Sequence, residues 1–184
     1  MNKKKVTERS RNDILVLGLD PGSRCTGYGF VRETSGQLIL VDAGTIRPGP
    51  SKDLAGRLGY IFTGLVSLIE KYRPDEAAVE EVFTAFNSSA ALKLGQARGA
   101  ALVACAAQQL PVFSYEPTKI KKSLVGAGRA DKTQVAFMVG QLLNCRQKWA
   151  KDTSDALAVA IAHLNQRKLA LQIEQVEKIR RHKL

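Results

Sequence analysis

Residues 14–22 read Ile14-Leu15-Val16-Leu17-Gly18-Leu19-Asp20-Pro21-Gly22, an apolar run that stops at a carboxylate, a proline and a glycine. Because apolar side chains occupy both alternating sets of positions, the run predicts a central strand covered on both faces of a sheet. Pro21 cannot donate to a strand ladder and Gly22 suits a turn, so the strand should end at Asp20. A carboxylate there must be solvated, paired with a cation or bound to metal, since burying it alone costs several kcal/mol. Asp20 either shapes the turn or begins a site.

The segments after Asp20 predict an α/β fold in which helices cover both faces of a five-stranded mixed sheet. Strands at 26–31 and 37–41 flank the turn signal Ser35-Gly36, so the first three strands should be antiparallel. Leucines and isoleucines recur at helical spacing from Ser51, a candidate N-cap, to Tyr72. Such a crossover helix favours parallel pairing of the next strand. The remaining predicted elements are strands at 75–83 and 111–115 and helices at 87–109, 117–126, 131–143 and 151–164.

Length and charge limit the organisation of the chain and its partners. Its 184 residues suit one domain. The 28 Lys and Arg against 17 Asp and Glu give a net charge of +11, which favours a polyanionic partner over an acidic protein or a small cation. Basic residues gather at both ends and in 117–151, where eight oppose the single acid Asp131. We expect a disordered basic tail at 1–13, a folded domain at 14–165 and a basic helical tail at 166–184.

The three cysteines and the hydropathy of the chain point to a cytosolic protein. Cys25, Cys105 and Cys145 are odd in number and lack CxxC spacing, which predicts reduced thiols instead of disulfides or a zinc site. No apolar run reaches the roughly 20 residues of a membrane span. Residues 1–13 also lack the apolar stretch of a signal peptide. We therefore expect no membrane partner.

Carboxylates are expected at strand ends and helix starts in three separate parts of the chain. Glu80 and Glu81 point to opposite faces of their strand, so only one of them can approach Asp20. Asp152 and Asp155 share a helix face, although they could also serve as N-cap and first-turn residues. Oxygen ligands suit a hard divalent cation. Two such ions about 4 Å apart can activate water and stabilise the leaving oxygen in phosphodiester hydrolysis.

Several other features each leave two interpretations open. Gly27 and Gly29 leave one face of their strand without side chains, which could accommodate either a ligand or a closely packed helix. Basic residues around the 126–128 loop either contact phosphate or form a solvated face. Phe83 is a core residue or a contact residue, and the alanine-rich face of 90–104 packs on its own sheet or on a second subunit. His163 is expected to be a packed or capping residue.

Four motifs, taken together, resemble a known family over residues 14–164. They are Leu19-Asp20-Pro21-Gly22-Ser23-Arg24 with Thr26-Gly27-Tyr28-Gly29, then Val79-Glu80-Glu81-Val82-Phe83, then Ala91-Leu92-Lys93-Leu94-Gly95-Gln96-Ala97-Arg98-Gly99, and Asp152-Thr153-Ser154-Asp155-Ala156-Leu157-Ala158. In this order they resemble the RuvC family of Holliday-junction resolvases. The resemblance implies an RNase H-like nuclease domain, a homodimer, and paired nicking of equal-polarity strands in four-way DNA junctions during recombination and repair. It also implies two Mg²⁺ ions per site, with Mn²⁺ as a substitute, and branch-migration partners of the RuvA and RuvB type.

The resemblance assigns roles to individual residues of this chain. The family's four metal-binding, catalytic acids fall on Asp20, Glu80, Asp152 and Asp155, so Glu80 is favoured over Glu81. Its junction-contacting aromatic residue falls on Phe83. Its two DNA-binding lysines fall on Lys121 and Lys132, and Lys132 also belongs to the catalytic set. The tail before Ile14 extends beyond the usual family start and receives no role.

Other classes of protein share parts of this pattern. Sugar kinases and actin-like ATPases also carry Asp-x-Gly-Ser followed by Thr-Gly, as in residues 20–27. Those folds need two lobes and a second glycine-bearing phosphate loop, whereas this chain has Asp155-Ala156-Leu157 there. A non-catalytic DNA-binding module would leave the four acids unexplained, because acids near DNA weaken binding unless metal neutralises them. A related RNase H-like nuclease with another substrate is the remaining alternative.

Overall fold

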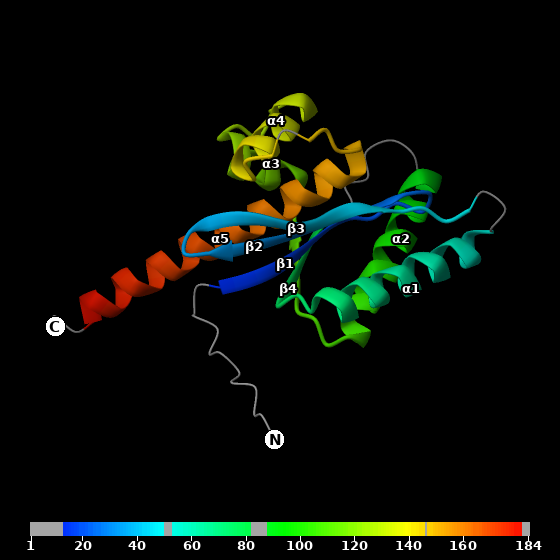
Figure 1. The fold of residues 1–184 in the computed structure, drawn as a ribbon, viewed down its shortest axis with the longest axis horizontal. Helices are drawn as coiled ribbons and strands as arrows, with labels where there is room; N and C mark the ends of the chain where they lie inside the picture. Colours follow the sequence, from blue (N-terminus) through cyan, green and yellow to red (C-terminus); the bar gives the residue numbers. More distant parts are fainter. Residues whose placement is uncertain (1–12, 50–52, 82–87, 146, 182–184) are drawn as a thin grey trace, which may run out of the picture.

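The computed structural model describes residues 13–49, 53–81, 88–145 and 147–181. Five strands form one sheet in the order β3-β2-β1-β4-β5 (Figure 1). The strands are β1 (Asp13–Asp20), β2 (Thr26–Thr34), β3 (Gln37–Ile46), β4 (Glu76–Glu80) and β5 (Val112–Tyr115). The helices are α1 (Leu54–Tyr72), α2 (Ser88–Ala107), α3 (Pro117–Val125), α4 (Lys132–Leu142) and α5 (Lys151–Arg181).

The sheet has the predicted topology, with β1 at its centre. The pairs β1–β2 and β2–β3 are antiparallel, and β4 pairs parallel with both β1 and β5. Ser35 and Gly36 form the predicted turn, both with positive φ. β2 runs past its predicted end at 31 because its last residues pair with the start of β3, and β3 runs past 41 because its later residues pair back to Thr26. The five-stranded mixed α/β prediction is confirmed.

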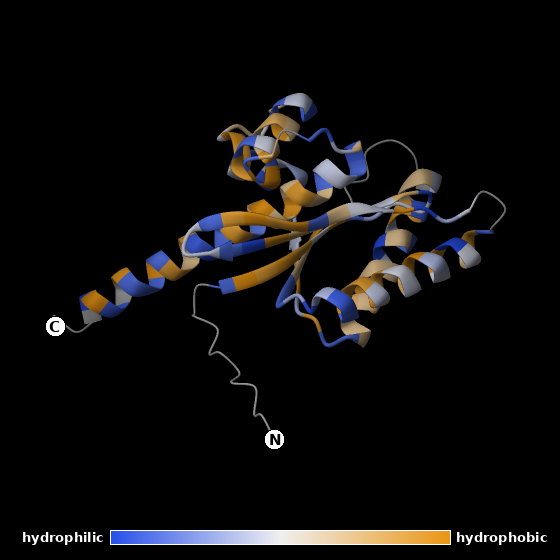
Figure 2. Ribbon diagram, in the orientation of Figure 1, coloured by the Kyte–Doolittle hydropathy of each residue, from blue (hydrophilic) through white to orange (hydrophobic). Residues whose placement is uncertain are grey.

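Two helical layers cover the sheet, and alternate residues of β1 divide between them. Ile14 and Val16 lie in the core formed with α3, α4 and α5. Leu15, Leu17 and Leu19 lie in the opposite core, formed with α1 and α2. Figure 2 shows the first half of α5, which crosses the sheet, as largely hydrophobic and its second half as mixed. Both faces of β1 are therefore buried, as the apolar run predicts.

Glycines in β1 and β2 let α5 lie directly against the sheet. A Cβ on Gly18 would overlap the carbonyl oxygen of Ala156, and a Cβ on Gly29 would come 2.5 Å from Leu157 Cδ2. A Cβ on Gly27 would overlap the backbone carbonyl of Asp152. The bare strand face thus accommodates a closely packed helix. The alternative of a ligand against Gly27 and Gly29 is wrong, since α5 occupies that space.

Helix starts differ from the sequence predictions at two places. Asp53 caps α1, its carboxylate accepting from Gly56 N at 2.7 Å, and Ser51 lies outside the described residues. α5 begins at Lys151, so Asp152 lies in its first turn and is not its N-cap. The N-cap role proposed for Asp152 is therefore wrong, and its position in the first turn suits the helix dipole.

The predicted domain limits also need adjustment. Asp13 belongs to β1 and pairs with Thr34, while residues 1–12 lie outside the described part of the chain. The predicted boundary at residue 166 falls inside α5, which continues unbroken to Arg181. Its later turns are exposed, so the pattern of buried residues that predicts an end at residue 164 cannot reveal them. Among the described helices, none is sufficiently long and hydrophobic to span a bilayer.

The alanine-rich face of α2 packs within its own subunit. Ala97, Ala101 and Ala104 are buried, and α2 packs against α1. This resolves the open alternative for the later part of the face, whereas Ala90 and Leu94 in its first part are exposed. Leu92 and Val103, on the other side of α2, are 64% and 59% exposed.

Candidate active site

One row of residues across the sheet carries two of the candidate carboxylates. Asp20 pairs with Gly27, and Gly27 pairs with Thr45 on β3. On the other side, Leu19 lies beside Val79, so the parallel register places Glu80 next to Asp20. Residues in one row point to the same face of a sheet. Since Gly27 faces α5, the side chains of Asp20 and Glu80 also face α5.

The first turns of α5 bring the other two carboxylates to this row. The backbone of Asp152 lies over Gly27, the direct neighbour of Asp20 on β2. Asp155 follows three residues later, on the same face of the helix. The close packing of α5 against glycines therefore positions both aspartates at the end of β1.

Burial and mutual repulsion make these four acids one electrostatic cluster. Burial raises the pKa of Asp20 from 3.8 to about 7, helped by the charges of Glu80, Asp155 and Asp152. Burial also raises the pKa of Glu80, and the charge of Asp155 adds to this effect. The neighbouring carboxylates thus disfavour ionisation of Asp20 and Glu80, and a bound cation would remove that penalty.

Two lysines approach the cluster from α3 and α4. Lys132 Nζ lies 3.3 Å from Asp155 Oδ2, although 62% of the lysine side chain is exposed. The charges of Lys132 and Lys121 both lower the pKa of Glu80. A small pocket beside α5 is lined by both lysines together with Glu80 and Asp155. Asp131 caps α4 through a capping box with Gln134, which fixes the helix start that carries Lys132.

The donor set fits a hard divalent cation. Among the described residues, no three His, Cys, Asp or Glu side chains lie close enough together to hold a metal ion as they stand. The four acids nevertheless offer only carboxylate oxygens, the ligand type that Mg²⁺ and Mn²⁺ prefer. The pKa of Asp20 is raised first by burial and then by the charges of the three other acids, and a bound cation would offset both effects. The chemistry of the site, more than its present spacing, supports a metal.

A group of polar residues on the β3 side of the cluster was not predicted from the sequence. Burial raises the pKa of the Cys25 thiol to about 11, and the nearby carboxylate of Asp152 adds to this effect. Arg47 and Thr45 act on the pKa of the same thiol in the opposite direction, and Arg47 Nε donates to Thr45 Oγ1 at 3.1 Å. Thr45 and Arg47 lie beyond the predicted end of β3 at residue 41. No local signal in the sequence links them to Cys25.

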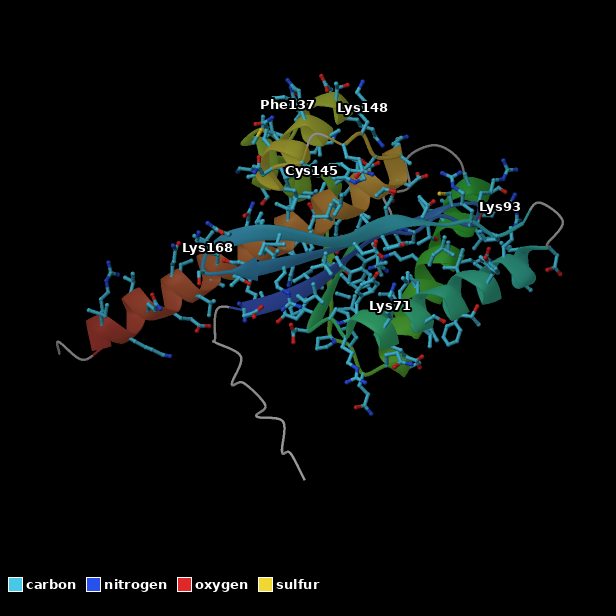
Figure 3. All side chains as sticks on the ribbon, viewed as in Figure 1. Lys71, Lys93, Phe137, Cys145, Lys148 and Lys168 are labelled. Atoms are coloured by element: carbon cyan, nitrogen blue, oxygen red, sulfur yellow. The ribbon has the colours of Figure 1, made fainter. Side chains whose placement is uncertain are left out.

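The remaining candidates lie apart from the carboxylates or outside the described residues. Phe83 lies outside the described residues, so its predicted role stays a prediction. His163 is 3% exposed and hydrogen-bonds Glu76 at 2.6 Å and Tyr115 at 2.7 Å. It is a packed residue, as expected. Figure 3 labels Lys71, Lys93, Lys148 and Lys168 on separate parts of the surface, so the net charge alone does not mark one DNA-binding face.

Comparison with known proteins identifies the family. The family model described as crossover junction endodeoxyribonuclease RuvC matches residues 16–163. The RuvC of Solidesulfovibrio magneticus is 60% identical over 157 residues, which cover 85% of this chain and 93% of that protein. The RuvC of Lawsonia intracellularis is 56% identical over 165 residues, which cover 90% and 98% of the two chains.

Solved structures give the same result. A structure described as T. thermophilus RuvC in complex with Holliday junction substrate matches with a TM-score of 0.80 and 31% identity, covering 85% of this chain and 96% of that one. A yeast mitochondrial Holliday junction resolvase matches with a TM-score of 0.66 at 14% identity, a likeness of fold alone. The family is a nuclease that needs a divalent metal. This chain belongs to the RuvC family of crossover junction endodeoxyribonucleases.

Proposed function

We propose that this chain resolves Holliday junctions in recombination and DNA repair by metal-dependent nicking of two strands of equal polarity. The observation that carries the proposal is the meeting of Asp20 and Glu80 with the first turns of α5, beside Lys132, in a chain of this family. Family membership disfavours the kinase and actin-like alternative. The four-way junction is the DNA partner, and branch-migration proteins of the RuvA and RuvB type are proposed to deliver it.

Asp20, Glu80, Asp152 and Asp155 would hold Mg²⁺, as two ions per site, with Mn²⁺ as a substitute. The metal would supply an activated water and stabilisation of the leaving oxygen. The four carboxylates orient this chemistry because strand ends and a packed helix fix their backbones. Lys132, 3.3 Å from Asp155, would stabilise negative charge on the reacting phosphate. Lys121 would bind the backbone beside Glu80.

Phe83 is proposed to open the junction by stacking on an unpaired base. It follows Glu80, the last residue of β4, by three positions. Base stacking on an aromatic side chain contributes about 1 to 3 kcal/mol. Phe83→Ala should leave the melting temperature nearly unchanged while junction distortion and cleavage fall. A large loss of stability would instead indicate a core residue.

A two-fold homodimer would match the two equivalent strands of a four-way junction. Because Ala97, Ala101 and Ala104 are buried within the subunit, we propose the exposed side of α2 for the contact. This side of the helix, which we call the α2 ridge, consists of Leu92, Gly95, Gly99 and Val103, which recur at helical spacing. No atom of the described residues lies within 4 Å of a Cβ added to either glycine, so a second helix could approach closely there.

We also place the protein in the bacterial cytoplasm. Its relatives are bacterial proteins. All three cysteines are free thiols in the structure, which suits a reducing compartment.

Cleavage of a synthetic four-way junction, beside a linear duplex of the same sequence, tests the proposed function. With Mg²⁺ the protein should nick two strands of the junction symmetrically and leave the duplex intact, and a chelator should abolish both nicks. Equal cleavage of the duplex would indicate a related nuclease with another substrate. Tight binding without cleavage would indicate a DNA-binding module.

A further inference from the structure

Arg47 lies at the β3 side of the carboxylate cluster, directly after the end of that strand. Its Nε donates to Thr45 Oγ1 at 3.1 Å, and Thr45 lies in the same row as Gly27 and Asp20. Arg47 and Asp152 both act on the pKa of the Cys25 thiol, in opposite directions. Arg47 therefore extends from a strand end that lies two strands from Asp20, beside the acids proposed to bind metal.

Among the residues that the structure describes, the guanidinium of Arg47 has a hydrogen-bond partner at Nε and none at its two terminal nitrogens. Within the described residues, no carboxylate forms an ion pair with it, whereas Arg32 pairs with Asp13 at 2.8 Å. The Nε contact with Thr45 restricts the orientation of the group, and the exposed residue leaves its terminal nitrogens available. Two parallel N–H donors match the oxygens of a phosphate.

Arg47 lies on one side of the carboxylate cluster, and Lys121 and Lys132 lie on the other. Glu80, beside Lys121 and Lys132, ends β4, and three strand spacings separate β4 from β3. Three spacings amount to about 14 Å. Consecutive phosphates of one strand advance about 3.4 Å along a duplex axis, so a strand crossing the cluster presents about four phosphates in this interval. Cations at both edges would hold such a strand across the carboxylates.

We propose that Arg47 binds a backbone phosphate of the cleaved strand, on the side of the carboxylate cluster opposite Lys132. This inference rests on the proposed function and adds a second phosphate-binding position to it. Lys132 and Lys121 hold the strand on the α3 and α4 side, and Arg47 holds it on the β3 side. The acids between them then face the bond that is cut.

The first measurement is the salt dependence of junction binding by Arg47→Ala, with Arg180→Ala as the matched control. Arg180 is exposed and lies 25 residues after Asp155 on α5, about 37 Å along the helix. Arg47→Ala should weaken binding about tenfold, as expected for a lost hydrogen bond to a charged group. It should also lower the slope of log K against log salt by about one. Arg47→Lys should restore the slope and only part of the affinity, because lysine lacks the paired donors.

A phosphate-by-phosphate cycle decides whether the contact is direct. Junctions carrying one neutral methylphosphonate at successive positions around the cut site are bound to the wild type, to Arg47→Ala and to Arg180→Ala. Neutralising the partner phosphate should remove the effect of Arg47→Ala at one position, and the effects should add at other positions. Wild-type cleavage of the unmodified junction is measured in parallel, so failure of the proposed function is seen separately.

Three outcomes would overturn the inference while leaving junction cleavage by the wild type intact. The effects of Arg47→Ala and of the methylphosphonate could add at every position. Arg180→Ala could weaken binding as much as Arg47→Ala, which would indicate a general charge effect. Finally, Arg47→Ala could slow cleavage of the bound junction without changing affinity, in which case Arg47 acts through Thr45 and Cys25 on Asp152.

Discussion

Asp20 is the residue at which burial and charge repulsion act most strongly. Its side chain ends the central strand, and its pKa is raised to about 7 by burial and by three neighbouring acids. Between the ordinary value of 3.8 and that raised value, the folded chain keeps a proton that the unfolded chain releases. Without metal, the free energy of unfolding therefore falls as the pH rises through this window.

Asp20→Asn should for this reason stabilise the metal-free protein. The gain should be small near the lower end of the window and greatest above its upper end, reaching at most about 4 kcal/mol. Denaturant unfolding in chelator across this pH range measures it. Cleavage should be abolished while junction binding remains. A variant that is less stable than the wild type at every pH would show that Asp20 has a structural role in its turn.

Lys121 and Lys132 should separate binding from chemistry. Lys132→Ala should lower single-turnover cleavage at saturating enzyme by about a hundredfold, since Lys132 Nζ lies 3.3 Å from Asp155, a proposed metal ligand. Lys121→Ala should reduce the salt slope of junction binding by about one. Lys122→Ala, the exposed neighbour on α3, is the matched control and should change neither quantity. An unchanged slope for Lys121→Ala would exclude its phosphate contact.

At the scale of elements, the site depends on how closely α5 lies on β1 and β2. The contact is made at Gly27, where the strand backbone meets the backbone of Asp152. A side chain there would push the first turn of α5 away from Asp20. The packing of the helix against the strands therefore sets the spacing of the acids.

Gly27→Ala tests this dependence. Because the added Cβ overlaps backbone atoms that cannot rotate away, it should cost about 1 to 3 kcal/mol of stability. It should also reduce single-turnover cleavage well beyond its effect on junction affinity. Gly59→Ala is the control: it lies in α1 with open space around it, and alanine should stabilise that helix by up to about 1 kcal/mol. Full activity of Gly27→Ala would mean that α5 need not lie so close.

Sequence reasoning predicted the elements better than their contacts. The strand around Leu17 and the turn at Gly36 carry local signals, and both are found. Ser51 and Asp53 are equally good caps by residue type, so only the folded backbone decides between them. The exposed half of α5 lacks the buried pattern that marks its first half.

The candidate site shows the same limit. Asp20 and Asp152 could be singled out because a strand end and a helix start are visible locally. Their grouping with Glu80 instead of Glu81 came from the resemblance to a family. The contact of Arg47 with Thr45 and their influence on Cys25 could not be predicted, since both lie at or beyond a strand end that pattern alone placed too early.

At the scale of the whole molecule, the proposed dimer depends on the α2 ridge. Leu92 and Val103 are large apolar side chains left exposed by the fold, and their removal from solvent would stabilise a pair of subunits. The ridge lies on the far side of α2 from α1, so a partner there would leave the subunit core undisturbed.

Val103→Glu should break the dimer by placing a charge in this contact. Sedimentation should shift from a two-chain species to the 20.0 kDa monomer, with an unchanged circular dichroism spectrum. Val41→Glu, an equivalent change at the exposed edge strand β3, is the control and should leave the dimer intact. A wild type that stays monomeric both free and on the junction would exclude the paired-nick mechanism.

The anomalous scattering of Mn²⁺ in crystals of the protein tests the central claim most directly, because it locates the metal independently of activity. The account predicts strong anomalous density among the carboxylate oxygens of Asp20, Glu80, Asp152 and Asp155, and its loss in Asp20→Asn. Mn²⁺-dependent cleavage by a protein whose crystals show no density there, or density at another set of ligands, would contradict it.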